Sequence, residues 1–363
     1  MQPIQRLREL DFLRGIAIIF VIFRHQVLFS FLQIMGWIGV DLFFVLSGFL
    51  VSGLLFKEYQ KFGKINPKLF LIRRGFKIYP IYYLTYIGYT IPKILLHKLE
   101  FKKVLFDLFF IQNYTLGWGY AYPASWSLAI EEHFYFGLAL LLGFIFNKNL
   151  INFKTDKHNN CNVFERLLGF ILISVLLLRI ISNIWFPNEI VKNTTMTHLR
   201  IDSLLAGVLI SYWFYFKRDR LNLFYFKYQK YLLILPFLLL SFTPFLNNLH
   251  SFFVKTIGFT MVYIAFGVLL IHFLLEEEIN TKMNRFFTKK VVDFISKIGF
   301  CSYSIYVIHS FIIDLVGYLH IQNQYINFLL VFLISINIGF IMTYQIEKYF
   351  LTYRNKYFPS RVI

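Results

Sequence analysis

Two polar residues in the first long apolar segment could do chemistry, and their spacing brings them onto one surface. Arg14 and His25 are eleven residues apart, which puts both side chains within about 20° of one helix face and about 16 Å apart along the axis. Both are costly in lipid, which favours a face that lines a polar cavity. The segment alone leaves a second interpretation open, with Arg14 snorkelling to the interface and His25 bonded to a neighbouring helix.

Ionisable residues interrupt other apolar segments at a similar depth. Counted at about 1.5 Å per residue, His25, Asp41, Glu131 and His309 fall about 18–22 Å above one membrane face. Buried ionisable groups in a membrane bundle pair with one another and mark functional sites. A histidine beside a carboxylate is the minimal general-base arrangement. We therefore predict a catalytic layer of His25, Asp41 and Glu131, with His309 at the same level.

Two more polar residues, Arg200 and Asp202, lie near the outer end of their apolar segment. Together with His309 they are the residues predicted to contact the substrate. Glu132 follows Glu131 and must point to another helix face, and His133 is expected to be an interfacial polar residue. These residues form no spacing typical of a metal site, so no metal is predicted.

A basic block precedes the aromatic run IYPIYY at the start of another apolar segment. It contains Arg73, Arg74 and Lys77. For any one of these residues, anchoring at the cytoplasmic face explains the charge. The alternative is a phosphate clamp, because paired arginines suit bidentate phosphate contacts, and Arg14 would lie on the same side.

The composition is that of a polytopic membrane protein. Of 363 residues, 58% are hydrophobic and 15% charged, whereas a soluble domain has roughly 25% charged residues. The net charge of +18 does not indicate nucleic-acid binding, because Lys and Arg lie in the gaps between apolar segments, where they set topology and contact anionic lipid. The two cysteines, Cys161 and Cys301, give no disulfide framework.

The apolar segments predict an all-α integral membrane bundle of about ten helices, each near the roughly 20 residues that a bilayer requires. Basic residues alternate between the gaps so that both termini are expected in the cytoplasm. The shorter run 104–116 is expected to be interfacial or re-entrant rather than spanning. We expect one integral membrane domain over 1–363, a polar loop at 147–162 and no appended soluble domain. The predicted segments are 11–32, 36–56, 74–96, 125–147, 164–186, 198–216, 229–247, 253–275, 297–319 and 325–349.

The sequence resembles the membrane-bound acyltransferase 3 family over nearly its whole length. The resemblance is carried, in the family's order, by a set of short motifs that are weak singly and specific together. They are Arg14-x10-His25, GVDLFFVLSGFL, RR-x-x-K-I-Y-P, WSL-x-x-EEHFYF, RIDSLLAG and SYSIYVIH.

The resemblance implies transfer of an acyl group, usually acetyl from acetyl-CoA, to sugars of cell-surface or lipid-linked glycans at the inner (plasma) membrane. It implies that His25 is catalytic, that Glu131 is an essential acid, and that Arg14, Arg73 and Arg74 handle the acyl-CoA. No permanently bound cofactor is expected. His25 would either deprotonate the acceptor hydroxyl or carry the acyl group itself.

A transporter is the alternative function class. A layer of His, Asp and Glu in the membrane also suits a proton-coupled carrier or an exporter of lipid-linked glycans. Carriers often show inverted repeats and pairs of broken helices, and the sequence shows no such pair. Acyl-CoA binding discriminates between the two classes.

Overall fold

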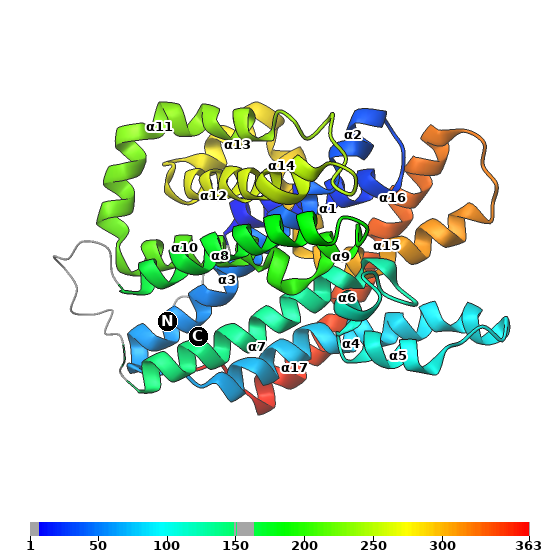
Figure 1. Cartoon of the computed structure of the whole chain (residues 1–363), viewed down its shortest axis with the longest axis horizontal. Coiled ribbons are helices and arrows are strands. Elements are labelled where there is room, and N and C mark those ends of the chain that lie inside the picture. Colours follow the sequence, from blue (N-terminus) through cyan, green and yellow to red (C-terminus); the bar gives the residue numbers. More distant parts are fainter. Residues whose placement is uncertain (1–6, 149, 151–162, 363) are drawn as a thin grey trace.

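The computed structural model describes residues 7–148, 150 and 163–362, and it confirms an all-helical membrane bundle (Figure 1). The predicted loop at 147–162 and Cys161 lie almost entirely outside the described residues. The first half of the bundle contains α1 (Arg8–His25), α2 (Ser30–Met35), α3 (Ile38–Phe62), α4 (Pro67–Leu95), α5 (Phe101–Leu108), α6 (Gln112–Thr115), the 3-10 turn η1 (Pro123–Ser125), α7 (Trp126–Asn147) and α8 (Val163–Trp185). The second half contains α9 (Lys192–Thr195), α10 (Thr197–Phe216), α11 (Arg218–Leu240), the π-turn η2 (Val254–Gly258), α12 (Phe259–Leu275), α13 (Ile279–Phe287), α14 (Lys289–Phe300), α15 (Ser302–Gly317), α16 (Gln324–Ile341), the π-turn η3 (Met342–Glu347) and α17 (Lys348–Tyr357).

Fewer helices than the predicted ten have the length and hydropathy of a membrane span. Seven do among the described residues, and the bent pair α14–α15 would make eight. The remaining two predicted spans correspond to α1 and α4. Helix α1 carries several charges and α4 is rich in tyrosine, which lowers their mean hydropathy. Such a composition suits helices with one face toward a polar interior, and α4 also exposes Leu84, Ile87 and Ile91.

Several predicted segments differ from the structure in their bounds, most clearly the first and the ninth. The first helix ends at His25 and not at residue 32, so His25 lies on its last turn. The predicted helix 297–319 is broken at Cys301, where α14 and α15 bend by 78°. The run 104–116 forms the short helices α5 and α6, and eight residues reach only about 12 Å, too short to cross a membrane.

The turn between α3 and α4 fixes where the basic block begins. Gly63 ends α3 with a φ of +71°, a conformation that glycine adopts without a Cβ penalty. Asn66 then caps α4 by accepting a hydrogen bond from the Leu69 amide (3.0 Å), and Pro67 occupies the first helical position. Because α4 begins at Pro67, Arg73 and Arg74 lie two helical turns into it, close to the end of α3.

Helices α3 and α10 form the middle of the bundle, with α12, α13 and α14 on one side in this view and α4, α7 and α17 on the other (Figure 1). Glycines allow their backbones to touch. A Cβ on Gly48 would lie 1.9 Å from the Leu204 carbonyl oxygen, and one on Gly207 would lie 2.2 Å from that of Val45. Small residues at such crossings are the usual means of close helix packing in membranes.

Both termini lie at one end of the bundle. Helices α1 and α3 form an antiparallel pair, so the start of α1 and the end of α3 share that end. The C-terminal residues close against α3, where Arg361 forms an ion pair with Glu58 (2.6 Å). We call this the termini end. That it faces the cytoplasm remains a prediction from the distribution of basic residues.

Candidate functional site

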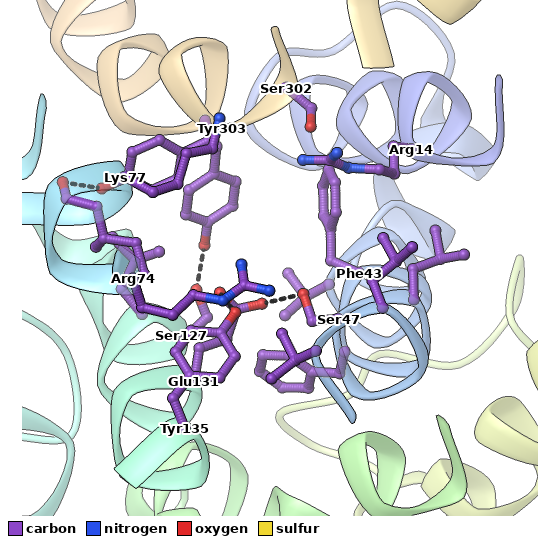
Figure 2. Close-up of a pocket in the computed structure, with 18 residues that line it drawn as sticks. Arg14, Phe43, Ser47, Arg74, Lys77, Ser127, Glu131, Tyr135, Ser302 and Tyr303 are labelled. Carbon is purple, nitrogen blue, oxygen red and sulfur yellow. Dashed lines mark hydrogen bonds between the residues drawn. The ribbon is translucent and has the colours of Figure 1, made fainter. Parts of the chain in front are cut away.

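Three cavities follow one another through the bundle, and six of the nine predicted site residues line them. The middle one, which we call the basic cavity, encloses about 150 Å³ between α1, α3, α4, α7 and α15 (Figure 2). Arg14, Arg74 and Lys77 line it together with Glu131. Figure 2 shows the Arg14 and Arg74 guanidinium groups reaching into this space from opposite helices.

Glu131 is the carboxylate of the basic cavity. Ser47 Oγ donates to Glu131 Oε1 (2.8 Å) and the Tyr135 hydroxyl donates to Oε2 (3.0 Å), so both oxygens are held in place. The Arg74 guanidinium lies over the Tyr135 ring, 5.5 Å from its centroid. Glu132 points elsewhere and accepts from Tyr79 (2.9 Å), as two consecutive helical residues must.

The two arginines of the basic block separate. Arg74 lines the basic cavity, whereas Arg73 donates to the Phe358 carbonyl and to Asn355 Oδ1 (3.4 Å) in the C-terminal segment. Both arginines, with Lys77, also line a second cavity at the termini end, which we call the entrance cavity. Because Arg74 and Lys77 border both spaces, the entrance cavity adjoins the basic cavity at these side chains.

The third cavity contains His25 and is called the histidine cavity. It encloses about 180 Å³ and opens between the loops at the end of the bundle opposite the termini. Val40 and Tyr306 line both this cavity and the basic cavity, so the two meet there. His25 is solvent-accessible through this space. Its lining also includes Trp37, Trp118, Trp126, Arg24, Arg200, Asn248 and Phe259.

The immediate partner of His25 is a second imidazole. The ring centroids of His25 and His309 are 5.2 Å apart. His309 is fully buried, and its Nδ1 lies 2.5 Å from the Tyr306 carbonyl oxygen, which orients the ring. The predicted carboxylate beside His25 is not found: no Asp or Glu of the described chain lines the histidine cavity. The Nε2 of His309 lies 3.2 Å from Ser310 Oγ, so His309, predicted to bind substrate, contacts His25 through ring packing and not through a hydrogen bond.

The other predicted carboxylates pair with arginines. Asp41 is fully buried and lies 2.8 Å from Arg200, with a second bond from Ser203 Oγ (3.0 Å). Asp202 pairs with Arg179 at 2.8 Å, and both side chains are inaccessible. Asp41 and Asp202 therefore lie behind the wall of the histidine cavity, and of these four charged residues only Arg200 reaches its surface. The single catalytic layer predicted from depth is divided between two cavities and this buried cluster.

Sequence reasoning missed several residues of the site. Arg179 interrupts an apolar segment, which was a readable signal of a buried partner. Arg24 interrupts the segment 11–32 in the same way, whereas Tyr306 carried no such signal, because its neighbours come from segments far away in the chain. Within the described part of the chain, no group of three or more potential metal ligands occurs.

Comparison with known proteins identifies the family of the chain. The sequence profile of the acyltransferase domain of the acyltransferase 3 family matches residues 7–344, which is nearly the whole chain. The chain belongs to the acyltransferase 3 family. This confirms the family that the motifs indicated, and it accounts for the order in which they occur.

Three curated relatives of this acyltransferase 3 chain illustrate the likeness. A Staphylococcus aureus (strain COL) protein named "Putative O-acetyltransferase" is 29% identical over 87% of this chain and 52% of its own length. An O-acetyltransferase of S. aureus (strain NCTC 8325), OatA, is 31% identical over 56% of this chain and 34% of its own. The peptidoglycan O-acetyltransferase OatA of Listeria monocytogenes is 34% identical over 35% of this chain and 22% of its own. The chain thus spans about half the length of the first of these relatives. No solved structure matches it.

Proposed function

We propose that this chain is a membrane O-acyltransferase that moves an acyl group, most simply acetyl, from acyl-CoA to a hydroxyl of a glycan. One observation carries the proposal. The entrance, basic and histidine cavities adjoin in series through shared lining residues, between the termini end and the opposite end of the bundle. A donor and an acceptor could meet along this row of cavities from opposite sides of the plasma membrane.

The donor would enter through the entrance cavity. Acyl-CoA carries phosphates at one end and its thioester at the other, joined by a long, thin pantetheine arm. Arg74, Lys77 and Arg14 supply the positive charge that phosphates need, and arginine forks bind phosphate oxygens bidentately. With the phosphates there, the arm points past Tyr306 toward His25.

The acceptor would enter the histidine cavity from the other side. His25 removes the proton from the acceptor hydroxyl, and the oxygen attacks the thioester carbonyl carbon. The C–S bond then breaks, the acyl C–O bond is complete, and CoA leaves as the thiolate, which takes up a proton. His309 fixes the ring orientation of His25, while Glu131 and Arg14 remain on the donor side as the charges closest to the arm.

The family membership favours an enzyme over a carrier, the other class that the sequence left open. A carrier would need to expose one site alternately to each side. In the proposed enzyme, the pantetheine arm reaches past Val40 and Tyr306 only to deliver the acyl group, and CoA and the acylated glycan leave on the sides from which the substrates came.

The test compares the acetyl content of surface glycans, measured by NMR, in cells with the wild-type chain, with His25→Ala and with no chain. Membrane insertion is measured in parallel. We expect wild-type acetylation to disappear in His25→Ala while the amount of inserted protein stays the same. Wild-type acetylation by His25→Ala would overturn the assignment of His25. Equal acetylation with and without the wild-type chain would overturn the function.

A further inference from the structure

The histidine cavity offers hydrogen-bond donors and positive charge, and it offers no negative charge. Its lining contains two arginines, Arg24 and Arg200, and within the described chain no Asp or Glu. Two half-buried tryptophans, Trp118 and Trp126, supply aromatic surface around it, and a third, Trp37, reaches it with 5% of its side chain exposed. The polar part of the lining therefore resembles a site for an anion, and the aromatic part resembles a site for a ring.

Several of these donors have no partner. Arg200 bonds Asp41 through Nη2 and packs against Phe259, but its Nε and Nη1 make no hydrogen bond, although the side chain is 2% exposed. The indole N–H of Trp37, 5% exposed, is also unpaired. A buried donor without an acceptor is costly. Since arginine and tryptophan can only donate, the missing groups must be acceptors.

Arg24 is the charge most available to a ligand. It is half-buried, next to His25 on the last turn of α1, and its own partners are neutral. It donates to the Gln33 carbonyl oxygen and to Asn248 Oδ1, both at 3.3 Å, which is long for a charge-assisted bond. No carboxylate of the described residues neutralises it. A guanidinium held so loosely beside a reactive imidazole is free to turn toward an incoming anion.

We infer that the acceptor is a sugar bearing a carboxylate, with the carboxylate bound by Arg24 and the ring stacked on the tryptophans. This inference rests on the proposed function, because it names the class of acceptor for the same site. Carboxylate oxygens are acceptor-only and match a guanidinium that no carboxylate of the described residues neutralises. The sugar face, with its axial C–H bonds, matches an aromatic surface. Arg24 then fixes the sugar so that one hydroxyl faces His25.

The first test is a binding measurement that needs no turnover. The purified full chain in lipid nanodiscs is titrated with methyl β-D-glucuronide and with methyl β-D-glucuronamide, which differ only in carboxylate against carboxamide. Tryptophan fluorescence reports binding, because three of the five tryptophans line the cavity. We expect the glucuronide to bind at least about tenfold more tightly, the effect of a charge-assisted bond.

Three variants separate the role of Arg24 from general damage. Arg24→Gln should bring the glucuronide-to-glucuronamide affinity ratio close to one, and Arg24→Lys should keep an intermediate ratio. Arg285→Gln, at an exposed arginine of α13 far from the cavity, is the control and should keep the wild-type ratio. Equal affinities in the wild type, no saturable signal with the glucuronide, or an unchanged ratio in Arg24→Gln would overturn the inference.

A second readout uses turnover with acetyl-CoA and the same two sugars. Arg24→Gln should lower kcat/KM for the glucuronide by at least about tenfold more than for the glucuronamide. An equal fall in kcat with both sugars would show that Arg24 stabilises charge on the acyl group, and it would overturn recognition of a carboxylate. If no acceptor supports CoA release but the binding preference is present, the proposed acyl transfer fails and the inference about the ligand stands.

Discussion

The neighbouring residues Arg73 and Arg74 provide a matched test of the donor site. They have the same side chain and adjacent positions on α4, yet only Arg74 reaches the basic cavity, while Arg73 binds the C-terminal segment. Replacement of either by lysine keeps the charge and the topology signal. It removes the planar fork that holds two phosphate oxygens at once.

The magnitude follows from the bond that is lost. One charge-assisted hydrogen bond contributes about 1.5–3 kcal/mol, which is about one to two decades in affinity. Arg74→Lys should therefore raise the KM for acetyl-CoA about 10- to 100-fold at saturating acceptor. Arg73→Lys should change it less than about threefold, because Arg73 lines only the entrance cavity and its guanidinium is already engaged by Asn355 and Phe358.

The assay measures CoA release by the purified variants in nanodiscs, with a thiol reagent, as acetyl-CoA is varied. The KM for the acceptor is measured in the same preparations and should stay constant in both variants. Equal effects of the two substitutions would show that the separation of Arg73 from Arg74 has no functional meaning. An unchanged KM for acetyl-CoA in Arg74→Lys would remove Arg74 from the donor site.

Three further outcomes are expected. His309→Ala should lower kcat about tenfold or more and leave the KM for acetyl-CoA within about threefold. The reason is that its ring orients the base His25 and lies away from the donor's phosphates. A raised KM for acetyl-CoA with an unchanged kcat would refute this. Gly48→Ala should destabilise the chain by about 1–3 kcal/mol, read as a lower Tm, because its Cβ would meet a backbone oxygen. Gly137→Ala is the control for Gly48→Ala, because a Cβ at Gly137 meets nothing within 4 Å, and it should keep the wild-type Tm. Similar Tm values for Gly48→Ala and Gly137→Ala would argue against the close crossing of α3 and α10. Arg179→Met should lower the free energy of unfolding by about 3–5 kcal/mol, because it leaves the Asp202 carboxylate buried alone. The added change Asp202→Leu should recover much of the lost Tm. No recovery would mean that the pair is not what stabilises this region.

The sequence predicted those parts of the site that depend on one helix. Arg14 and His25 share a face because the helix repeat places them there, and each lines a cavity. Glu131 faces the interior while Glu132 turns away, again as the repeat requires. The membrane class followed from composition, since so few charges and so many apolar residues suit no soluble core.

What the sequence left open depends on contacts between distant segments. The estimated depth of Asp41 in the membrane predicted that it lies beside His25. Its carboxylate instead pairs with Arg200, which comes from a segment far along the chain. The basic block could not show that Arg73 turns toward a segment near residue 358. Likewise, a run of apolar residues continues past His25, so nothing in the pattern marked the end of α1 there.

A reaction across a sealed membrane tests most directly the proposed transfer of an acyl group from a donor on one side to an acceptor on the other. The purified chain is reconstituted in vesicles that enclose acetyl-CoA, a glycan acceptor is supplied outside, and acetyl esters outside and free CoA inside are measured together. If the acyl group is transferred as proposed, one CoA thiol appears inside for each ester outside. His25→Ala, reconstituted to the same density, forms neither product. Ester formation at the wild-type rate by His25→Ala, or passage of intact acetyl-CoA or glycan without ester formation, would contradict the proposed transfer.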